Sequence, residues 1–142
     1  MSEAHSKISV LLADDDESIR RAVAKGLRVW GCCVLECADG QAILDGLKSD
    51  TFDVAIVDLS MPKLSGWEAL EVVTREAPLT RVIVFTAQPE QRVFADAVGA
   101  SALVEKPVDM DVLCEWVDKL AHQDVKERVD RLCGLSDLPV VA

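Results

Sequence analysis

Four groups of reactive side chains stand out because each comes at or just after the end of a short apolar run. Aspartates carry most of this chemistry, and carboxylate oxygens without histidine or thiolate neighbours suit Mg²⁺. Carboxylates that share one place also repel, by roughly 3 kcal/mol for a pair ~5 Å apart at an effective dielectric of ~20. A bound cation relieves that repulsion. In chain order the residues are Asp14, Asp15, Asp16, Asp58, Thr86 and Lys106.

Beside a bound Mg²⁺, an aspartate can attack phosphorus and become an aspartyl phosphate. The added charge then needs an ammonium group such as Lys106 and a hydroxyl donor such as Thr86. Each residue alone also has an ordinary role, because an aspartate can cap a helix or end a strand and a lysine can be solvated. The combination favours a site that holds a metal ion and a phosphoryl group.

The apolar runs have strand length and alternate with segments of helical period. A parallel sheet covered by helices on both faces is the expected result, with right-handed crossovers and therefore a doubly wound α/β fold. Ligands of such sheets bind outside the carboxyl ends of the strands. All four reactive groups fall at that edge. The runs are 8–13, 32–37, 52–57, 81–85 and 102–104, and the last helix is expected from Asp109 to Leu120.

Length and charge exclude several classes of protein. A chain of 142 residues, half of them apolar, predicts one main core. The formal charge of −10 disfavours direct nucleic-acid binding. No apolar run approaches the length of a membrane span and the first residues lack signal-peptide character, so we expect a cytoplasmic protein. Three of its five cysteines lie in an apolar, strand-like stretch, which favours buried small side chains in a reducing compartment, and a zinc site is not expected.

The chain resembles the receiver domain of two-component response regulators over residues 7–120. The resemblance rests on VLLADDDESIR (10–20), DLSMPKLSG (58–66), FTA (85–87), GA (99–100) and EKP (105–107), which appear in this order. It implies a flavodoxin-like five-stranded sheet of order 2-1-3-4-5 with five helices. It also implies that Asp58 is the phosphoacceptor, supplied by a sensor histidine kinase or a histidine phosphotransfer protein, and that the switched output is a partner or dimer interaction.

The resemblance assigns further roles by position. Mg²⁺ would be bound by Asp15 and Asp58 directly, by Asp14 through water and by the Ser60 carbonyl. The phosphoryl group would contact Thr86, the backbone of Ala87 and Lys106, whose bond to Pro107 is expected to be cis. Ser60 and Gln88 would tune the rate of dephosphorylation. Such a domain is not an enzyme acting on other substrates, although it catalyses its own phosphorylation and slow dephosphorylation.

Two departures from the family pattern change the expectations. The position three before Lys106, commonly aromatic in receivers, is Leu103, so the conformational switch is expected to be weaker or more local. No output module is visible after residue 120, so the chain is either a stand-alone receiver or part of a longer protein. Residues 1–6 are expected to be flexible.

Residues 121–142 are expected to be either a helical extension or a linker. An apolar stripe formed by Ala121, Val125, Val129 and Leu132 favours a helix that packs or dimerises, ending before Gly134. A homodimer through this extension, or through the fourth helix, fifth strand and fifth helix near Val112 and Trp116, is the partner expected besides the kinase.

Two rival functions remain at this point. A Mg²⁺-dependent phosphohydrolase also uses an aspartyl nucleophile, but it usually carries the sequence D-x-D at its first strand and a further acidic pair after the lysine. Asp109 and Asp111 are better interpreted as the start of the last helix. The other rival is a protein-binding module in which the acidic edge is vestigial.

Overall fold

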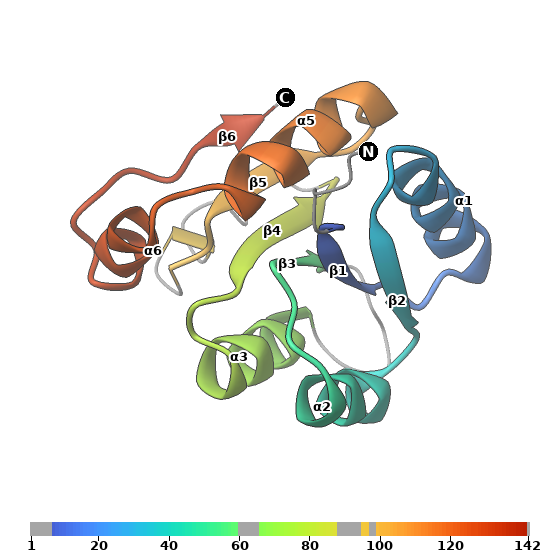
Figure 1. Ribbon diagram of the computed structural model, residues 1–142, viewed down its shortest axis with the longest axis horizontal. Helices are drawn as coiled ribbons and strands as arrows, with labels where there is room; N and C mark the ends of the chain where they lie inside the picture. Colours follow the sequence, from blue (N-terminus) through green and yellow to red (C-terminus); the bar gives the residue numbers. More distant parts are fainter. Residues whose placement is uncertain (1–6, 60–65, 88–94, 97–98, 142) are drawn as a thin grey trace.

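The computed structural model describes residues 7–59, 66–87, 95–96 and 99–141 (Figure 1). Its parallel strands lie in the order β2-β1-β3-β4-β5-β6, so the expected order 2-1-3-4-5 is confirmed. The expectation of five strands is wrong by one, because the last residues of the chain add a short strand beside β5. The strands are β1 (Ser9–Ala13), β2 (Cys33–Cys37), β3 (Val54–Asp58), β4 (Arg81–Thr86), β5 (Ala102–Glu105) and β6 (Val140–Val141).

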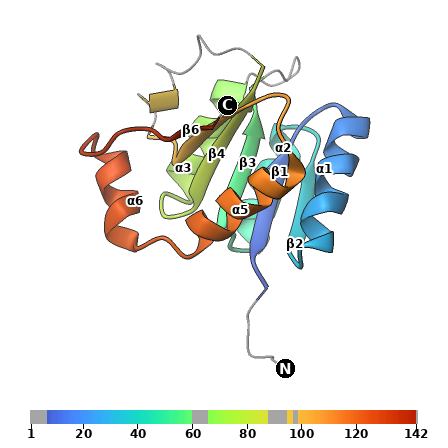
Figure 2. The ribbon, with the colours of Figure 1, turned by 90° about the horizontal axis from the view of Figure 1, so that it is seen from above.

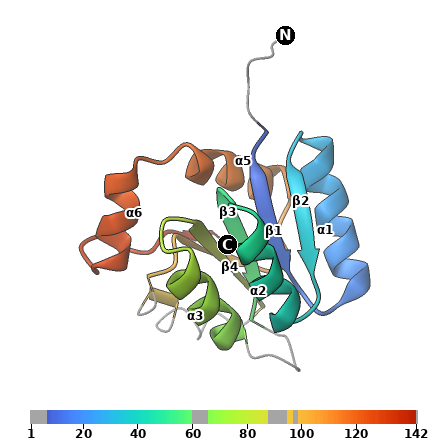
Figure 3. The same cartoon turned by 60° about the horizontal axis from the view of Figure 1, so that its bottom comes forward.

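Five helices lie within the described residues, and four of them cover the two faces of the sheet. α2 and α3 lie on one face, and α1 and α5 lie on the other (Figures 2 and 3). β3 is buried along its whole length, as expected for a strand covered on both sides. The helices are α1 (Glu17–Val29), α2 (Gly40–Ser49), α3 (Gly66–Glu76), α5 (Met110–Ala121) and α6 (Val125–Leu132).

Aspartates set the starting points of four helices. Asp16, Asp39, Asp109 and Asp124 each accept a hydrogen bond from a backbone N–H of the first turn. Asp16 is therefore occupied in capping α1, as an acidic residue outside the metal site should be. Asp109 begins the last helix of the receiver core, which agrees with its interpretation as a helix start.

The fourth helix of the expected pattern falls largely outside the described residues. Residues 95–96 are helical, and Ala95 is buried in the core on the α2 and α3 side. Phe94, Ala97 and Val98, the apolar positions expected on this helix, lie outside the described residues. Across the ranges that the structure describes, no helix has the length and apolar character required to cross a membrane.

The C-terminal residues form a helix and then a strand, and the predicted apolar stripe is wrong. α6 is separate from α5, and Val125 and Val129 are 51% and 41% exposed. Its buried side chains are Arg128 and Arg131. The predicted stop is present, because Gly134 has a φ of +73° just after the helix. The helix therefore packs through polar groups, which hydrophobic periodicity does not detect.

Candidate functional site

Asp58, Asp14, Thr86 and Lys106 meet at the carboxyl edge of the sheet because each lies at or just beyond the end of a central strand. Asp58 is the last residue of β3 and Thr86 the last of β4, while Asp14 follows β1 and Lys106 follows β5. Asp58, Asp14 and Thr86 are all buried, with 3%, 2% and 0% of their surface exposed. The strand ends thus place two carboxylates, a hydroxyl and an ammonium group together.

Lys106 forms an ion pair with Asp58. Its Nζ lies 2.7 Å from Asp58 Oδ2, and the two side chains are 19% and 4% exposed. The same Nζ lies 4.8 Å from the centre of the Phe85 ring, a cation–π contact that limits where the ammonium group can move. The Lys106 backbone N–H donates to the Thr86 carbonyl at 2.8 Å. β4 and β5 thereby fix the base of this lysine opposite Asp58.

Among the described carboxyl groups, Asp14 has the environment least favourable for charge. Burial, and to a smaller extent the neighbouring Asp58, raise its pKa from 3.8 to about 6 against the opposing effects of the Asp16 N–H and Lys106. The Asp16 N–H donates to Asp14 Oδ1 at 2.9 Å. Ionised Asp14 is therefore held beside a second carboxylate at a place that favours a cation.

A charged network fastens the backbone of this loop. Arg20, from the second turn of α1, donates through Nη1 to the Asp14 carbonyl at 3.0 Å and through Nε to Glu36 at 3.3 Å. Glu36 on β2 also accepts from Arg28 at 3.1 Å. Arg20 lay inside the aspartate-rich motif, but nothing in its type or spacing indicated this role. The network holds the backbone of Asp14, while the Asp14 side chain lies beside Asp58.

Leu103, the expected switch position, is fully buried in β5. It belongs to the core on the α2 and α3 side, where Leu138 and Val140 from the end of the chain pack against the same cluster. Its N–H donates to the Pro139 carbonyl at 2.9 Å. A role for Leu103 in switching remains a prediction, but its neighbours are now known to include the C-terminal segment.

The remaining predicted site residues differ in how far they can be placed. Asp15 follows Asp14 in the same loop and is partly exposed, and Ala87 is exposed just after β4. The Lys106–Pro107 peptide bond is cis. The predictions for Ser60 and Gln88 lie outside the described residues. Val112 and Trp116 are partly buried, and Trp116 packs against the core on the α1 and α5 side.

The residues present fit a Mg²⁺ ion that keeps most of its shell as water and phosphoryl oxygens. Asp14 and Asp58 supply adjacent carboxylates, and burial beside Asp58 raises the pKa of Asp14, so a cation bound there would favour its charged form. Within the described ranges, no three histidine, cysteine or acidic side chains form a complete metal cluster. Mg²⁺ does not require one, because it usually binds one or two carboxylates.

Comparison with known proteins identifies the family to which the chain belongs. The family model of the response regulator receiver domain matches residues 10–118. Response regulator protein PmrA of Pseudomonas aeruginosa is 34% identical over 125 residues, which cover 87% of this chain and 57% of that protein. The DNA-binding transcriptional regulator NtrC of Klebsiella pneumoniae is 32% identical over 82% of this chain but only 26% of its own length. The chain thus spans only part of these relatives.

Solved structures agree in fold. The chemotaxis protein CheY4 of Vibrio cholerae superimposes with a TM-score of 0.74 at 30% identity, covering 81% of this chain and 99% of that one. A CheY-like receiver domain protein from Methanospirillum hungatei gives a TM-score of 0.76 at 27% identity, covering 88% and 98% of the two chains. The fold, the strand-end residues and the family match together show that this chain belongs to the response regulator receiver domains of two-component signalling.

Proposed function

We propose that Asp58 accepts a phosphoryl group from a phosphohistidine of a sensor histidine kinase or a histidine phosphotransfer protein. The observation that carries this proposal is the placement of Lys106 Nζ 2.7 Å from Asp58 Oδ2, with the desolvated Asp14 next to the same carboxylate. A nucleophilic carboxylate with a cation on one side and a metal-binding carboxylate on the other is arranged for phosphoryl transfer.

The transfer exchanges one bond to phosphorus for another. An oxygen of the Asp58 carboxylate attacks the phosphorus atom, the bond from phosphorus to the histidine nitrogen breaks, and that nitrogen leaves with the electron pair. Lys106 moves its ion pair from the carboxylate to the new phosphoryl oxygens. Thr86, at the end of the neighbouring strand, is the hydroxyl donor to these oxygens, and the Ala87 backbone N–H is the second donor.

Asp14, Asp15, Asp58 and the Ser60 carbonyl would hold Mg²⁺ at this edge. When bound, the ion neutralises negative charge on the transferring group and draws the phosphoryl oxygens to a fixed position. Asp14 contributes a carboxylate whose charge is opposed by burial and by Asp58, so that a cation bound beside it is favoured. Arg20 contributes by holding the Asp14 carbonyl.

The domain acts as a signalling element that promotes its own phosphorylation and slow dephosphorylation, with Ser60 and Gln88 setting the lifetime of the phosphoryl group. We place this reaction in the cytoplasm, because all five cysteines are free thiols and a reducing compartment preserves them. The output is a change in a partner or dimer contact of the same molecule.

The proposal is tested by incubating the full chain with acetyl phosphate and Mg²⁺ and measuring its intact mass. We expect one phosphoryl adduct, lost on removal of Mg²⁺ and absent in Asp58→Asn, which keeps the shape of the side chain but removes the nucleophile. Asp45→Asn, a change of the same kind on the exposed face of α2, is the control and should be phosphorylated normally.

The same samples separate the rival functions. Continuous release of phosphate without accumulation of the adduct would indicate a phosphohydrolase. A folded protein that forms no adduct from either acetyl phosphate or a phosphorylated histidine donor would contradict the proposal and leave a binding module.

A further inference from the structure

The last twenty residues cover an edge of the sheet that would otherwise be open. Figure 1 shows α6 and β6 beyond β5, on the side away from β2. β6 pairs with β5 through Leu103↔Val140 and Val104↔Val141. Residues 123–141, here called the C-terminal segment, therefore occupy the backbone edge at which a sixth strand from any partner would otherwise pair.

Two buried arginines attach this segment to residues 99–101, just before β5, and to Pro78, just before β4. Arg128 is completely buried and donates to the carbonyls of Pro78 and Gly99 and, at 3.3 Å, to Ser101 Oγ. Arg131 is 3% exposed and donates through Nε to the Ala100 carbonyl at 2.8 Å.

The Asp96 carboxylate and Gly99 complete this attachment. Arg131 Nη1 pairs with Asp96 Oδ1 at 3.0 Å. A Cβ on Gly99 would meet the Leu132 Cα at 3.2 Å, and Gly99 has a φ of +76°, so only glycine permits this approach of α6.

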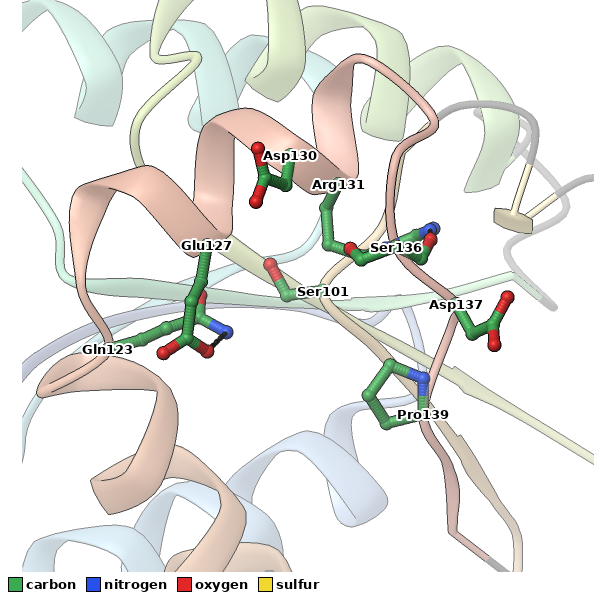
Figure 4. Close-up of a pocket in the computed structure, with 8 residues that line it drawn as sticks. All are labelled: Ser101, Gln123, Glu127, Asp130, Arg131, Ser136, Asp137 and Pro139. Carbon is green, nitrogen blue, oxygen red and sulfur yellow. Dashed lines mark hydrogen bonds between the residues drawn. The ribbon is translucent and has the colours of Figure 1, made fainter.

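This attachment is polar and incompletely packed. A pocket of about 170 Å³ lies between α6, Ser101 and the chain leading to β6, and polar side chains including Glu127, Asp130 and Ser136 border it (Figure 4). Arg128 has no carboxylate partner among the residues that the structure describes. Burial, together with the nearby charges of Arg131 and Arg81, lowers the pKa of Arg128 to about 10. A segment at the end of a chain that docks through polar contacts beside a pocket can open without global unfolding.

The same strand that carries the C-terminal segment also carries the lysine of the site. Lys106 follows β5 directly, and Leu103 and Val104 of β5 pair with β6. Transfer of the Lys106 ion pair from Asp58 to a phosphoryl group pulls on the end of β5. Leu138 and Val140 pack against the same core cluster as Leu103. A shift of β5 would therefore disturb the packing of the C-terminal segment.

Resting on the function proposed above, we propose that the C-terminal segment is a built-in occupant of the β5 edge, and that phosphorylation of Asp58 releases it. While Asp58 is unphosphorylated, the segment covers the edge. Release exposes the β5 edge and the carbonyls of Gly99 and Ala100 as one surface for a partner that offers an extended strand and an arginine.

Trypsin reports release directly, because Arg128 and Arg131 are buried when the segment is docked and cleavable when it is not. Full-length protein is digested briefly with and without acetyl phosphate and Mg²⁺, and the fragments and the phosphoryl adduct are measured by mass in the same samples. We expect cleavage at Arg128 and Arg131 to accelerate by about fivefold or more, as a typical coupling between sites would give. Cleavage at Arg21, which is exposed on α1, is the internal control and should not change.

The outcomes distinguish this inference from the function on which it rests. An adduct on Asp58 with unchanged or slower cleavage at Arg128 and Arg131 overturns the release of the segment but leaves phosphoryl acceptance intact. Failure to form any adduct overturns both. Asp58→Asn should show no acceleration with the donor, and acceleration in that variant would also overturn the inference.

A second variant tests the coupling in the opposite direction. Arg131→Gln removes the ion pair with Asp96 and should release the segment without any phosphoryl donor. Because coupling between two equilibria is reciprocal, this variant should bind beryllofluoride with Mg²⁺ more tightly than the wild type does. Lys126→Gln, on the exposed side of α6, should bind like the wild type. Cleavage at Arg128 that rises in Arg131→Gln without any gain in beryllofluoride affinity overturns the coupling.

Discussion

At the scale of a single residue, the ionised Asp14 carboxylate destabilises the folded protein at the site. Its carboxyl group is buried beside Asp58, and burial raises its pKa from 3.8 to about 6. Since the pKa is higher in the folded than in the unfolded protein, ionising Asp14 lowers the free energy of unfolding as the pH rises from about 4 to about 6. Above that range the whole cost is present, and a bound cation offsets it.

The first prediction follows from the destabilising effect of ionised Asp14. Asp14→Asn should raise the melting temperature of the Mg²⁺-free protein by roughly 3 °C or more at pH 7.5, and the gain should disappear towards pH 4. It should also abolish most of the stabilisation by millimolar Mg²⁺. Asp16→Asn is the matched control, because asparagine keeps the helix cap. Equal melting temperatures for Asp14→Asn and wild type at pH 7.5 would show that the carboxyl group is not destabilising.

Arg20 gives a second prediction at this scale. Arg20→Met removes the hydrogen bond to the Asp14 carbonyl, and Mg²⁺ should bind about tenfold more weakly, as is typical when a group that orients a metal ligand is lost. Calorimetric titration measures the dissociation constant. Arg28→Met is the control, since Arg28 contacts the same Glu36 but not the Asp14 loop. Equal losses in both variants would mean that the network only fastens β2 to α1.

At the scale of elements, the strands that position the site were predictable and the C-terminal segment was not. The apolar runs before Asp14, Asp58 and Thr86 became β1, β3 and β4 with boundaries shifted by two residues or fewer, because buried parallel strands leave a continuous apolar signal. α6 buries arginines and exposes valines, which inverts the usual pattern. β6 is held by backbone pairing over two residues, a contact with almost no sequence signature.

Leu103 provides the prediction that belongs to these elements. It is fully buried between the sheet core and the C-terminal segment. The larger ring in Leu103→Tyr should therefore lower the free energy of unfolding by about 1–3 kcal/mol and speed hydrogen exchange over residues 138–141. Leu103→Met, similar in volume, should have a smaller effect. Denaturant titration and hydrogen exchange measure the two effects, and wild-type values in the tyrosine variant would show that the position has spare room.

At the scale of the whole molecule, the site edge and the C-terminal segment are linked by β5, which ends in Lys106 and pairs with β6. The aspartates, threonine and lysine at the strand ends could be assembled from the sequence because the carboxyl ends of parallel strands share one edge. Their distances and their burial required the structure, as did the arginine contacts behind and beside them. The molecule is thus a receiver domain that also carries a covering segment on the strand next to its site.

The central claim, that Asp58 is the group that takes the phosphoryl, is tested most directly by chemical trapping. Borohydride reduces an aspartyl phosphate to homoserine, and peptide mass spectrometry then identifies the converted position after treatment with acetyl phosphate and Mg²⁺. We predict conversion at residue 58 and at no other aspartate, with none when Mg²⁺ is withheld. Conversion at residue 14 or 15 while residue 58 stays intact would contradict the account.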